Sequence, residues 1–417
     1  MQLKRVVVTG IGALTPIGNN LNDYWNALIN GVSGAAPITL FDASKFKTRF
    51  ACEVKNFDPT EFLDKKEARK LDRFAQFALV VSDQAMTDAG LNADNINPDR
   101  VGVVFASGIG GLTTFQHEVA AFTLGDGTPR FNPFFIPKMI LDIAAGHISM
   151  RHNLRGPNFA VVSACASSTN AIGQAFDIIR LGKSDVILAG GSEAVISEAG
   201  VAGFNAMKAM SERNDDPTTA SRPYDKDRDG FVMGEASGML VLEELEHAKA
   251  RGAKIYCEVM GCGATADAYH ITAPHPDGMG ARNVMLAALA EANMQPEEIH
   301  YINTHGTSTP IGDGAEVKAI TQVFGEHAYK LNISATKSMT GHCLGAAGVI
   351  EAIACIMAVI NDEVPPTINH FTDDPELDPK FNFTFNKAQK RTVNAALSNT
   401  FGFGGHNACV IVKKYQS

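Results

Sequence analysis

Apolar and polar residues alternate along this chain with two periodicities, one typical of helices and one typical of strands. Residues 3–14 predict a strand that leads into a turn at Gly10–Gly12. Helical spacing covers 21–31 and then 66–89, where the pattern ends near Gly90. The alternation of the two periodicities predicts an α/β architecture with helices covering sheets. The other predicted elements are strands at 101–107, 185–189, 239–242 and 299–303 and helices at 166–181 and 345–360.

The second half of the sequence repeats part of the first. The helix ending at 85–91 precedes a strand and a glycine loop, and the helix ending at 288–294 does the same. Cys165 and His342 each lie just ahead of a helix rich in small residues. We therefore expect a duplicated αβ unit, with related halves at 1–251 and 252–417.

Composition narrows the classes of function. The 417 residues are 45% hydrophobic and 19% charged, as in ordinary globular proteins, and the net charge of −9 argues against nucleic-acid binding. No apolar run approaches the ~18 residues of a membrane span, and no apolar signal segment precedes Val6. The seven cysteines include no CxxC pair. These features predict a cytoplasmic protein with free thiols and without a membrane span.

One predicted helix carries a basic cluster within this acidic background. The cluster fits either a solvated helix face or a docking patch for an acidic partner, and the sequence alone leaves both open. Its members are Lys65, Lys66, Arg69, Lys70 and Arg73.

Cys165 is the first candidate for chemistry. It ends an apolar strand, is flanked by small residues, and directly precedes a helix. Backbone N–H groups and the positive end of the helix dipole favour a thiolate at such a position. A buried structural cysteine explains this segment equally well.

Two histidines and a lysine are the other candidates. His305 follows the strand at 299–302 in a loop of glycine and hydroxyl residues, where catalytic side chains are often displayed. Lys337 and His342 lie in a Gly-rich turn that leads into a helix. Each histidine alone is more often structural, but together with Cys165 they favour nucleophilic catalysis.

Four segments in this order resemble the motifs of the β-ketoacyl synthases, a family of condensing enzymes. They are 156–172, 303–307, 337–348 and 399–405, and the resemblance extends over essentially the whole chain. It implies a thiolase-like fold, a duplicated αβαβα five-layer sandwich. It also implies decarboxylating condensation of acyl- and malonyl-[acyl-carrier-protein] to a 3-oxoacyl product.

Within this family the chain most resembles the synthase II group of dissociated bacterial fatty acid synthesis. Synthase I and polyketide or aryl-polyene ketosynthases are the alternatives. Starter-type synthases pair the cysteine with His and Asn. The third position here is His342, which argues against that class. Thiolases use a second cysteine as base, and the 337–348 motif does not resemble theirs. Non-catalytic chain-length factors lack the nucleophile, which Cys165 argues against.

The resemblance assigns roles to the candidate residues. Cys165 would accept the acyl chain, and His305 and His342 would bind the malonyl thioester carbonyl and assist its decarboxylation. Lys337 would hold the charge of the site in place. The backbone N–H groups of Cys165 and Phe403 would form an oxyanion hole, while the Phe403 side chain gates the acyl pocket.

The resemblance also implies binding sites around these residues. No organic cofactor is expected, because the carrier protein brings its own phosphopantetheine, and the family is homodimeric. The implied sets are Thr307, Thr309 and Thr272 for the pantetheine arm; Phe204, Ile109, Phe134 and Phe135 for the acyl pocket, part of it from the partner subunit; Arg130 and Lys208 beside the basic cluster; and Asn303, Glu351, Ser398 and Asn399 around a monovalent cation, Na+ or K+.

Three positions depart from the family pattern, and the segment 166–170 after Cys165 is not a clean match to synthase I or II. Cys343 stands beside His342 where an aliphatic residue is usual, and Ala273 stands where a serine is common. His406 follows Gly404 and Gly405 where a threonine is common. None of the three removes a catalytic group, and they leave the acyl chain length open.

Overall fold

The long strands pair into one ten-stranded mixed sheet whose order divides it into two halves. The computed structural model describes residues 3–416, so Met1, Gln2 and Ser417 lie outside the described residues. The first half runs β5 (Asn158–Val161), β4 (Val101–Ala106), β6 (Val186–Glu193), β7 (Ala236–Glu244), β1 (Val6–Leu14). The second continues with β8 (Cys257–Ala266), β14 (His406–Lys413), β13 (Ala395–Gly402), β9 (Tyr301–Asn303), β10 (Asn332–Ser334).

The two halves repeat one pairing pattern. In the first half β5, β4 and β6 are parallel, and β7 and then β1 add antiparallel. In the second half β10, β9 and β13 are parallel, and β14 and then β8 add antiparallel. The halves meet where β1 pairs with β8 through Val6, Val7 and Val8. The duplication predicted from the sequence therefore extends to strand order and direction.

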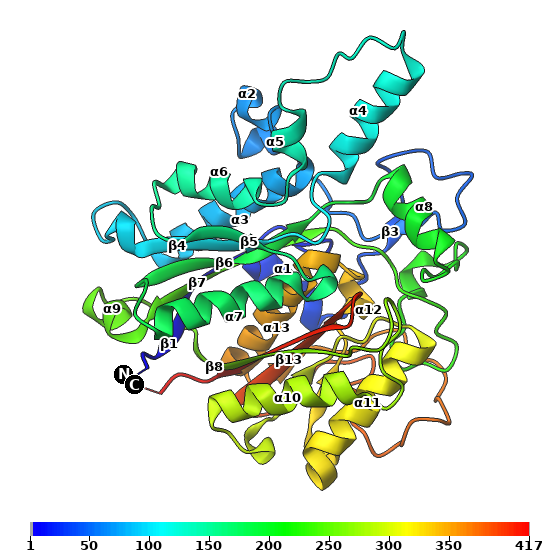
Figure 1. Ribbon diagram of the computed structural model, residues 1–417. Helices are drawn as coiled ribbons and strands as arrows, with labels where there is room; N and C mark the ends of the chain where they lie inside the picture. The colour runs from blue at the N-terminus through cyan, green and yellow to red at the C-terminus, as the bar shows by residue number, and fades with distance from the viewer. Residues whose placement is uncertain (1–2, 417) are drawn as a thin grey trace.

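Helices complete five layers, as the thiolase-like fold predicts. α7 (Ser167–Arg180) and α13 (Ala347–Asn361) lie between the two halves of the sheet (Figure 1). α3 (Arg73–Ala89) and α6 (Ile143–His152) cover the outer face of the first half, and α10 (Met279–Ala292) and α11 (Pro310–Phe324) cover that of the second. The predicted sandwich is confirmed.

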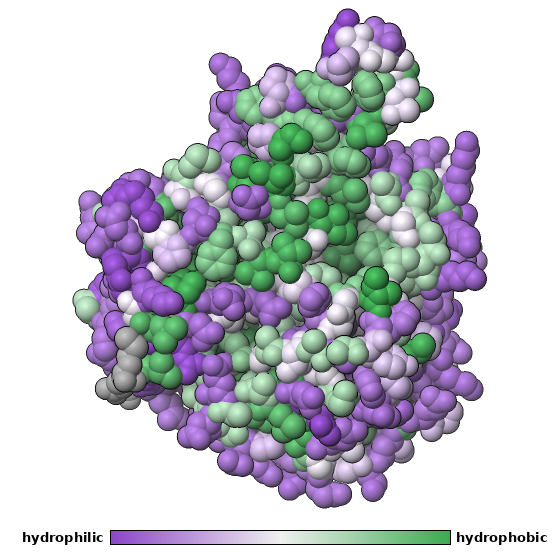
Figure 2. All heavy atoms as spheres, in the orientation of Figure 1, coloured by the Kyte–Doolittle hydropathy of each residue, from purple (hydrophilic) through white to green (hydrophobic). Residues whose placement is uncertain are grey.

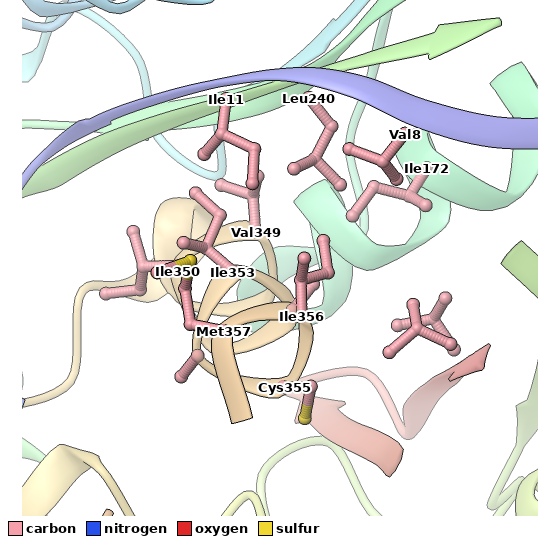
Figure 3. Packing of buried hydrophobic residues seen from close by; sticks show 14 of the residues in the cluster. Val8, Ile11, Ile172, Leu240, Val349, Ile350, Ile353, Cys355, Ile356 and Met357 are labelled. Atoms are coloured by element: carbon pink, nitrogen blue, oxygen red, sulfur yellow. The ribbon is translucent and has the colours of Figure 1, made fainter. Parts of the chain in front are cut away.

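The central helix α13 is the hydrophobic middle of the molecule. Every residue from Ala347 to Val359 is buried. Figure 3 shows Val349 and Ile353 facing Ile11 and Leu240 of the sheet. Within residues 3–416 this is the one helical stretch long and apolar enough to cross a membrane, but 89% of it is buried inside the protein, as in a core helix.

Two predicted elements differ in the structure. The helix predicted at 66–89 is broken into α2 (Lys65–Ala68) and α3, because the Asp72 carboxylate accepts the N–H of Phe74 and caps a new helix. The turn predicted at Gly10–Gly12 is part of β1, with a register shift between Val8 and Gly10. A Cβ on Gly12 would overlap the carbonyl of Val81, so glycine here allows α3 to pack closely on the strand.

The remaining elements lie around this frame. They are α1 (Leu21–Ile29), α4 (Leu112–Leu124), α5 (Phe135–Met139), α8 (Glu198–Ala206), α9 (Leu245–Ala250), α12 (Lys337–Thr340), and the short strand pairs β2 (Ala36–Pro37) with β3 (Phe50–Ala51) and β11 (Glu363–Val364) with β12 (Gln389–Lys390).

Candidate active site

The two central helices begin with the same backbone turn. Ala164 has φ of 51° and opens a single 3-10 turn before α7, and Leu344 has φ of 47° and opens the same turn before α13. Left-handed backbone at a non-glycine residue costs about 1 kcal/mol, so each turn is held by its surroundings. Cys165 thus corresponds to Gly345 in the second half, and His342 precedes that position.

Both turns open into one cavity of about 400 Å³. Cys165, His305 and His342 line it together, although they come from three separate segments of the chain. Six other residues predicted for the site also line this cavity: Phe204, Lys208, Thr272, Thr307, Thr309 and Phe403.

His342 lies between the other two reactive groups in contact, next to the Cys165 thiol on one side and the His305 ring on the other. His342 Nε2 is 3.0 Å from Cys165 Sγ. The rings of His305 and His342 have centroids 5.2 Å apart and are perpendicular. Their side chains can therefore reach one small group placed beside the thiol.

Both imidazoles are neutral at pH 7. Burial lowers the pKa of His305 and of His342 well below the usual histidine range, and the positive charge of Lys337 lowers both pKa values further. A neutral imidazole carries one N–H donor and one acceptor nitrogen. Each ring can therefore accept a proton or donate a hydrogen bond, depending on its tautomer.

The Cys165 thiol is protonated at rest. Burial raises its pKa to about 12, which outweighs the lowering effects of Lys337 and of the backbone N–H groups of Phe403 and Cys165. The amide groups predicted from the sequence lower the pKa of the thiol as expected, and burial opposes them. At 3.0 Å, His342 is placed to accept the proton.

Lys337 forms a buried ion pair rather than a surface charge. Its ammonium contacts Glu351 Oε1, and the side chains are 1% and 0% exposed. Burial raises the pKa of Glu351 to about 7, against the lowering effect of Lys337. The pair links the turn at α12 to the central helix α13.

Comparisons with known proteins agree with this geometry. The family profile "Beta-ketoacyl synthase, N-terminal domain" matches residues 3–248, and "Beta-ketoacyl synthase, C-terminal domain" matches residues 256–371. The chain belongs to the β-ketoacyl synthase family. The family predicted from the motifs is confirmed.

Full-length relatives place this ketosynthase within the family. The 3-oxoacyl-[acyl-carrier-protein] synthase 2 of Synechocystis sp. is 52% identical over 100% of this chain and 99% of its own length. The protein of that name from Staphylococcus aureus is 49% identical over 100% of both chains. The predicted place in the synthase II group is confirmed, and with it the enzyme class, an acyltransferase of fatty acid elongation.

A solved structure gives the same fold. A type II polyketide ketosynthase, in complex with its acyl-carrier protein and bound to a hexaketide, has a TM-score of 0.91 and 33% identity. The match covers 99% of this chain and 100% of that one.

Two buried glutamates of the ketosynthase were missed in the sequence. Glu316 on α11 accepts the backbone N–H groups of His305 and Gly306, both at 3.0 Å, and burial raises its pKa to about 7. Glu193 at the end of β6 accepts the N–H groups of Gly108 and Gly345 at 2.8 and 3.0 Å. The available signal was a carboxylate inside a helix face or strand that is otherwise apolar.

The residues predicted around a cation fit that group. Ser398 and Asn303 are directly paired on neighbouring strands. Within the described residues, Glu351 Oε2, Ser398 Oγ and Asn399 Oδ1 are buried without a hydrogen-bond partner. Buried acceptor oxygens without donors are what an oxygen-liganded cation requires. No cluster of three or more His, Cys, Asp or Glu suited to a metal occurs in residues 3–416.

Three residues predicted for the acyl pocket do not line the cavity of their own chain. Ile109 is partly buried and packs against the apolar cluster that contains Cys165. Phe134 and Phe135 lie on the projecting α4–α5 segment, where Phe134 is 39% exposed and Phe135 stacks on Phe115.

The basic cluster is exposed except for one member. Lys65, Lys66, Arg69 and Lys70 face solvent, as do Arg130 and Lys208. Arg73 instead forms an ion pair at 2.6 Å with the fully buried Glu235. Its guanidinium also lies over the ring of Phe77. Arg73 therefore has a structural role, and within the described residues its charge is already paired, unlike that of the other members of the cluster.

Proposed function

We propose that this chain, in the cytoplasm, condenses acyl- and malonyl-[acyl-carrier-protein] to 3-oxoacyl-[acyl-carrier-protein], CO2 and free carrier protein. The observation that carries the proposal is the 3.0 Å contact between His342 Nε2 and Cys165 Sγ, with His305 perpendicular beside it. One thiol and two neutral imidazoles suit both acyl transfer and enolate stabilisation.

Loading begins at the thiol. The Cys165 proton moves to His342 Nε2 as Sγ attacks the acyl thioester carbonyl. The oxyanion then accepts hydrogen bonds from the N–H groups of Cys165 and Phe403. As the carbon–sulfur bond to the carrier breaks, the departing sulfur takes the proton back from His342, which is neutral again.

Decarboxylation uses the two imidazoles as donors. The hydrogen of neutral His342 first moves from Nδ1 to Nε2 by proton exchange with solvent, so that the malonyl thioester carbonyl lies against an N–H group of His305 and the Nε2–H group of His342. When the bond to the carboxylate breaks and CO2 leaves, its electron pair moves onto this oxygen as an enolate. One such donor is typically worth about 100- to 1,000-fold in rate. Neutral rings suit this role, because each retains a proton to share.

Condensation returns the thiol to its starting state. The enolate carbon attacks the acyl-Cys165 carbonyl, and the new carbon–carbon bond forms as the bond to Sγ breaks. One proton from solvent restores the thiol. The pantetheine arm would lie along Thr307 and Thr309, whose hydroxyls are 3.0 Å apart, and Thr272 at the mouth. A monovalent cation among Asn303, Glu351, Ser398 and Asn399 would be structural.

The test is acyl loading read by intact mass. The protein is incubated with acyl-carrier proteins of graded chain length, and malonyl-carrier protein is then added. A one-acyl adduct that malonyl-carrier protein discharges into 3-oxoacyl product is expected. If no chain length forms an adduct, the proposal is overturned, and the chain lengths that load define the preference.

The carrier protein would dock on the exposed basic residues. Carrier proteins are acidic, and Lys65, Lys66, Arg69, Lys70, Arg130 and Lys208 offer positive charge, with Lys208 at the cavity. The polyketide relative bound to its own acyl-carrier protein supports such a partner. Electrostatic docking of this kind weakens with salt.

Charge reversal at Lys66 and Arg69 should raise the KM for the carrier about tenfold at low salt, with kcat nearly unchanged. The difference should shrink at high salt, as steady-state kinetics at two ionic strengths would measure. Lys183→Glu, an exposed lysine outside the cluster, is the control. An unchanged KM after charge reversal at Lys66 and Arg69 would refute docking here.

Arg73→Ala should instead lower the free energy of unfolding by about 3 kcal/mol, because it leaves Glu235 buried without its partner.

We also propose that the protein is a homodimer through one apolar face. β5 ends the sheet and has a neighbour on one side only, so its other edge is free to pair. Green residues gather on this face in Figure 2, at the foot of the projecting segment. The exposed apolar residues there include Phe115, Phe122, Phe131, Phe134, Phe159 and Val162. In the dimer, Phe134 and Phe135 of one subunit would reach the acyl pocket of the other.

Phe159→Glu should convert the dimer to monomer and raise the dissociation constant of the dimer about 100-fold or more. A two-fold symmetric interface contains the substituted residue of both subunits, so two carboxylates would be buried in it. Sedimentation equilibrium measures the mass against 44.5 kDa for one chain. Leu286→Glu, which changes an apolar residue on α10 that is 44% exposed against 37% for Phe159, should leave the dimer intact. A monomeric wild-type protein would contradict the proposal.

The halves 1–251 and 252–417 are proposed as units that divide the chemistry. The first carries the nucleophile and the second carries both histidines and Lys337.

A further inference from the structure

The turn that carries Phe403 is covered by the ring of His406. His406 pairs with Gly402 across the last step of the β13–β14 hairpin. A Cβ built on Gly404 would lie 2.9 Å from His406 Nε2 and 3.1 Å from Cδ2, so the ring rests on the Gly404 backbone. Gly404 has φ of 89°, which a side chain at that position would strain. The ring itself is exposed to solvent on its other side.

The rest of the turn is held by backbone hydrogen bonds. Gly404 N–H donates to Ile271 at 2.7 Å, and Gly405 N–H donates to Gly402 at 3.1 Å. The Asp267 N–H donates to Gly405 at 2.9 Å. These bonds hold the turn against the neighbouring loop, and His406 supplies the side-chain contact made on Gly404 itself.

This turn lies directly against the backbone of the segment that carries the nucleophile. A Cβ on Gly402 would lie 2.7 Å from the Ser163 carbonyl and 3.1 Å from the Cys165 nitrogen. The Phe403 N–H is close enough to Cys165 to lower the pKa of its thiol. A small shift of the turn therefore moves one of the two oxyanion donors.

We propose that His406 is a positioning residue for the oxyanion hole. Its ring takes the place of the side chain that Gly404 lacks, and covers the backbone of the turn two residues before it. In this way it holds the Phe403 N–H where the oxyanion forms. This inference rests on the proposed function, and it accounts for a ring where a threonine is common in the family.

The test compares His406→Ala with His406→Phe, which keeps a flat ring but no polar atom. The alanine variant should lower kcat for acyl transfer to Cys165 about three- to tenfold, with KM for the acyl carrier changed less than about twofold. Amide hydrogen exchange at 402–405 should be faster in this variant. The phenylalanine variant should recover most of the rate and protection, and melting temperatures should stay similar because the side chain is exposed.

Two results would overturn the inference. One is an alanine variant with wild-type exchange at 402–405 and wild-type kcat. The other is a phenylalanine variant as slow as alanine, which would make the imidazole nitrogens responsible instead of the ring surface. The exchange measurement needs no substrate, so it tests the turn separately from the proposed function. A wild-type protein that accepts no acyl chain would refute the function alone.

Discussion

Replacing Cys165 with alanine should abolish the acyl adduct and lower the condensation rate by about 10,000-fold or more, while malonyl-carrier protein is still decarboxylated. The nucleophile is the one group that bonds to the acyl chain. The two imidazoles that stabilise the enolate come from other segments, and their neutral state owes nothing to the thiol. Intact mass measures the adduct, and CO2 release and 3-oxoacyl product are followed separately.

A second cysteine provides the control. All seven cysteines are free, and Cys262 is the most exposed of them, so it is the alternative target for acylation. Cys262→Ala should keep the adduct and the full rate of condensation. If the adduct persists in Cys165→Ala and disappears in Cys262→Ala, the assignment of the nucleophile is wrong. Loss of decarboxylation together with condensation would mean that the thiol also shapes the enolate site.

Replacing Lys337 with methionine should lower the free energy of unfolding by about 3–5 kcal/mol at pH 8, since Glu351 must then either keep a buried charge without its partner or take up a proton. The loss should be smaller at pH 6. The pKa of Glu351 is already raised to about 7, so its folded form takes up a proton more readily than its unfolded form, and it is neutral at the lower pH. Urea denaturation at both pH values measures the difference.

The double variant Lys337→Met with Glu351→Gln separates charge from packing. It should recover most of the stability at pH 8, because no buried charge remains. Activity gives an independent readout. Lys337 lowers the pKa of both catalytic histidines, so its removal should raise those pKa values and move the acid limb of the rate profile to higher pH. An acid limb that stays in place would show that Lys337 does not control the histidines.

The sequence was most informative where an apolar strand is followed closely by a reactive residue. Cys165 and His305 follow such strands, and His342 and Lys337 share a turn rich in glycine. Each lies in a short motif that can be read without knowledge of distant contacts. The structure brings all four together at the seam between the halves. The fold followed from the same local signals, because the duplication repeats them in one order.

Features that depend on distant partners could not be predicted. Arg73 looked like one more exposed base until Glu235, far along the chain, was found against it. The burial that raises the pKa of Cys165 could not be predicted, because the sequence shows the helix that follows the thiol but not the residues that pack around it. Glu316 lacks a motif, and its role follows only from the loop that folds onto it.

The close approach of α7 and α13 limits how this enzyme can change over generations. A Cβ on Gly348 would overlap the Thr169 hydroxyl, and the Val349 N–H donates to Ser168 at 3.0 Å. The two helices therefore pack so closely that there is no room for a side chain at position 348. The nucleophile precedes one helix and His342 the other. We expect positions 168–169 and 348–349 to vary together in descendants. A chimaera joining the first half of one ketosynthase to the second half of another should work only when these four residues match.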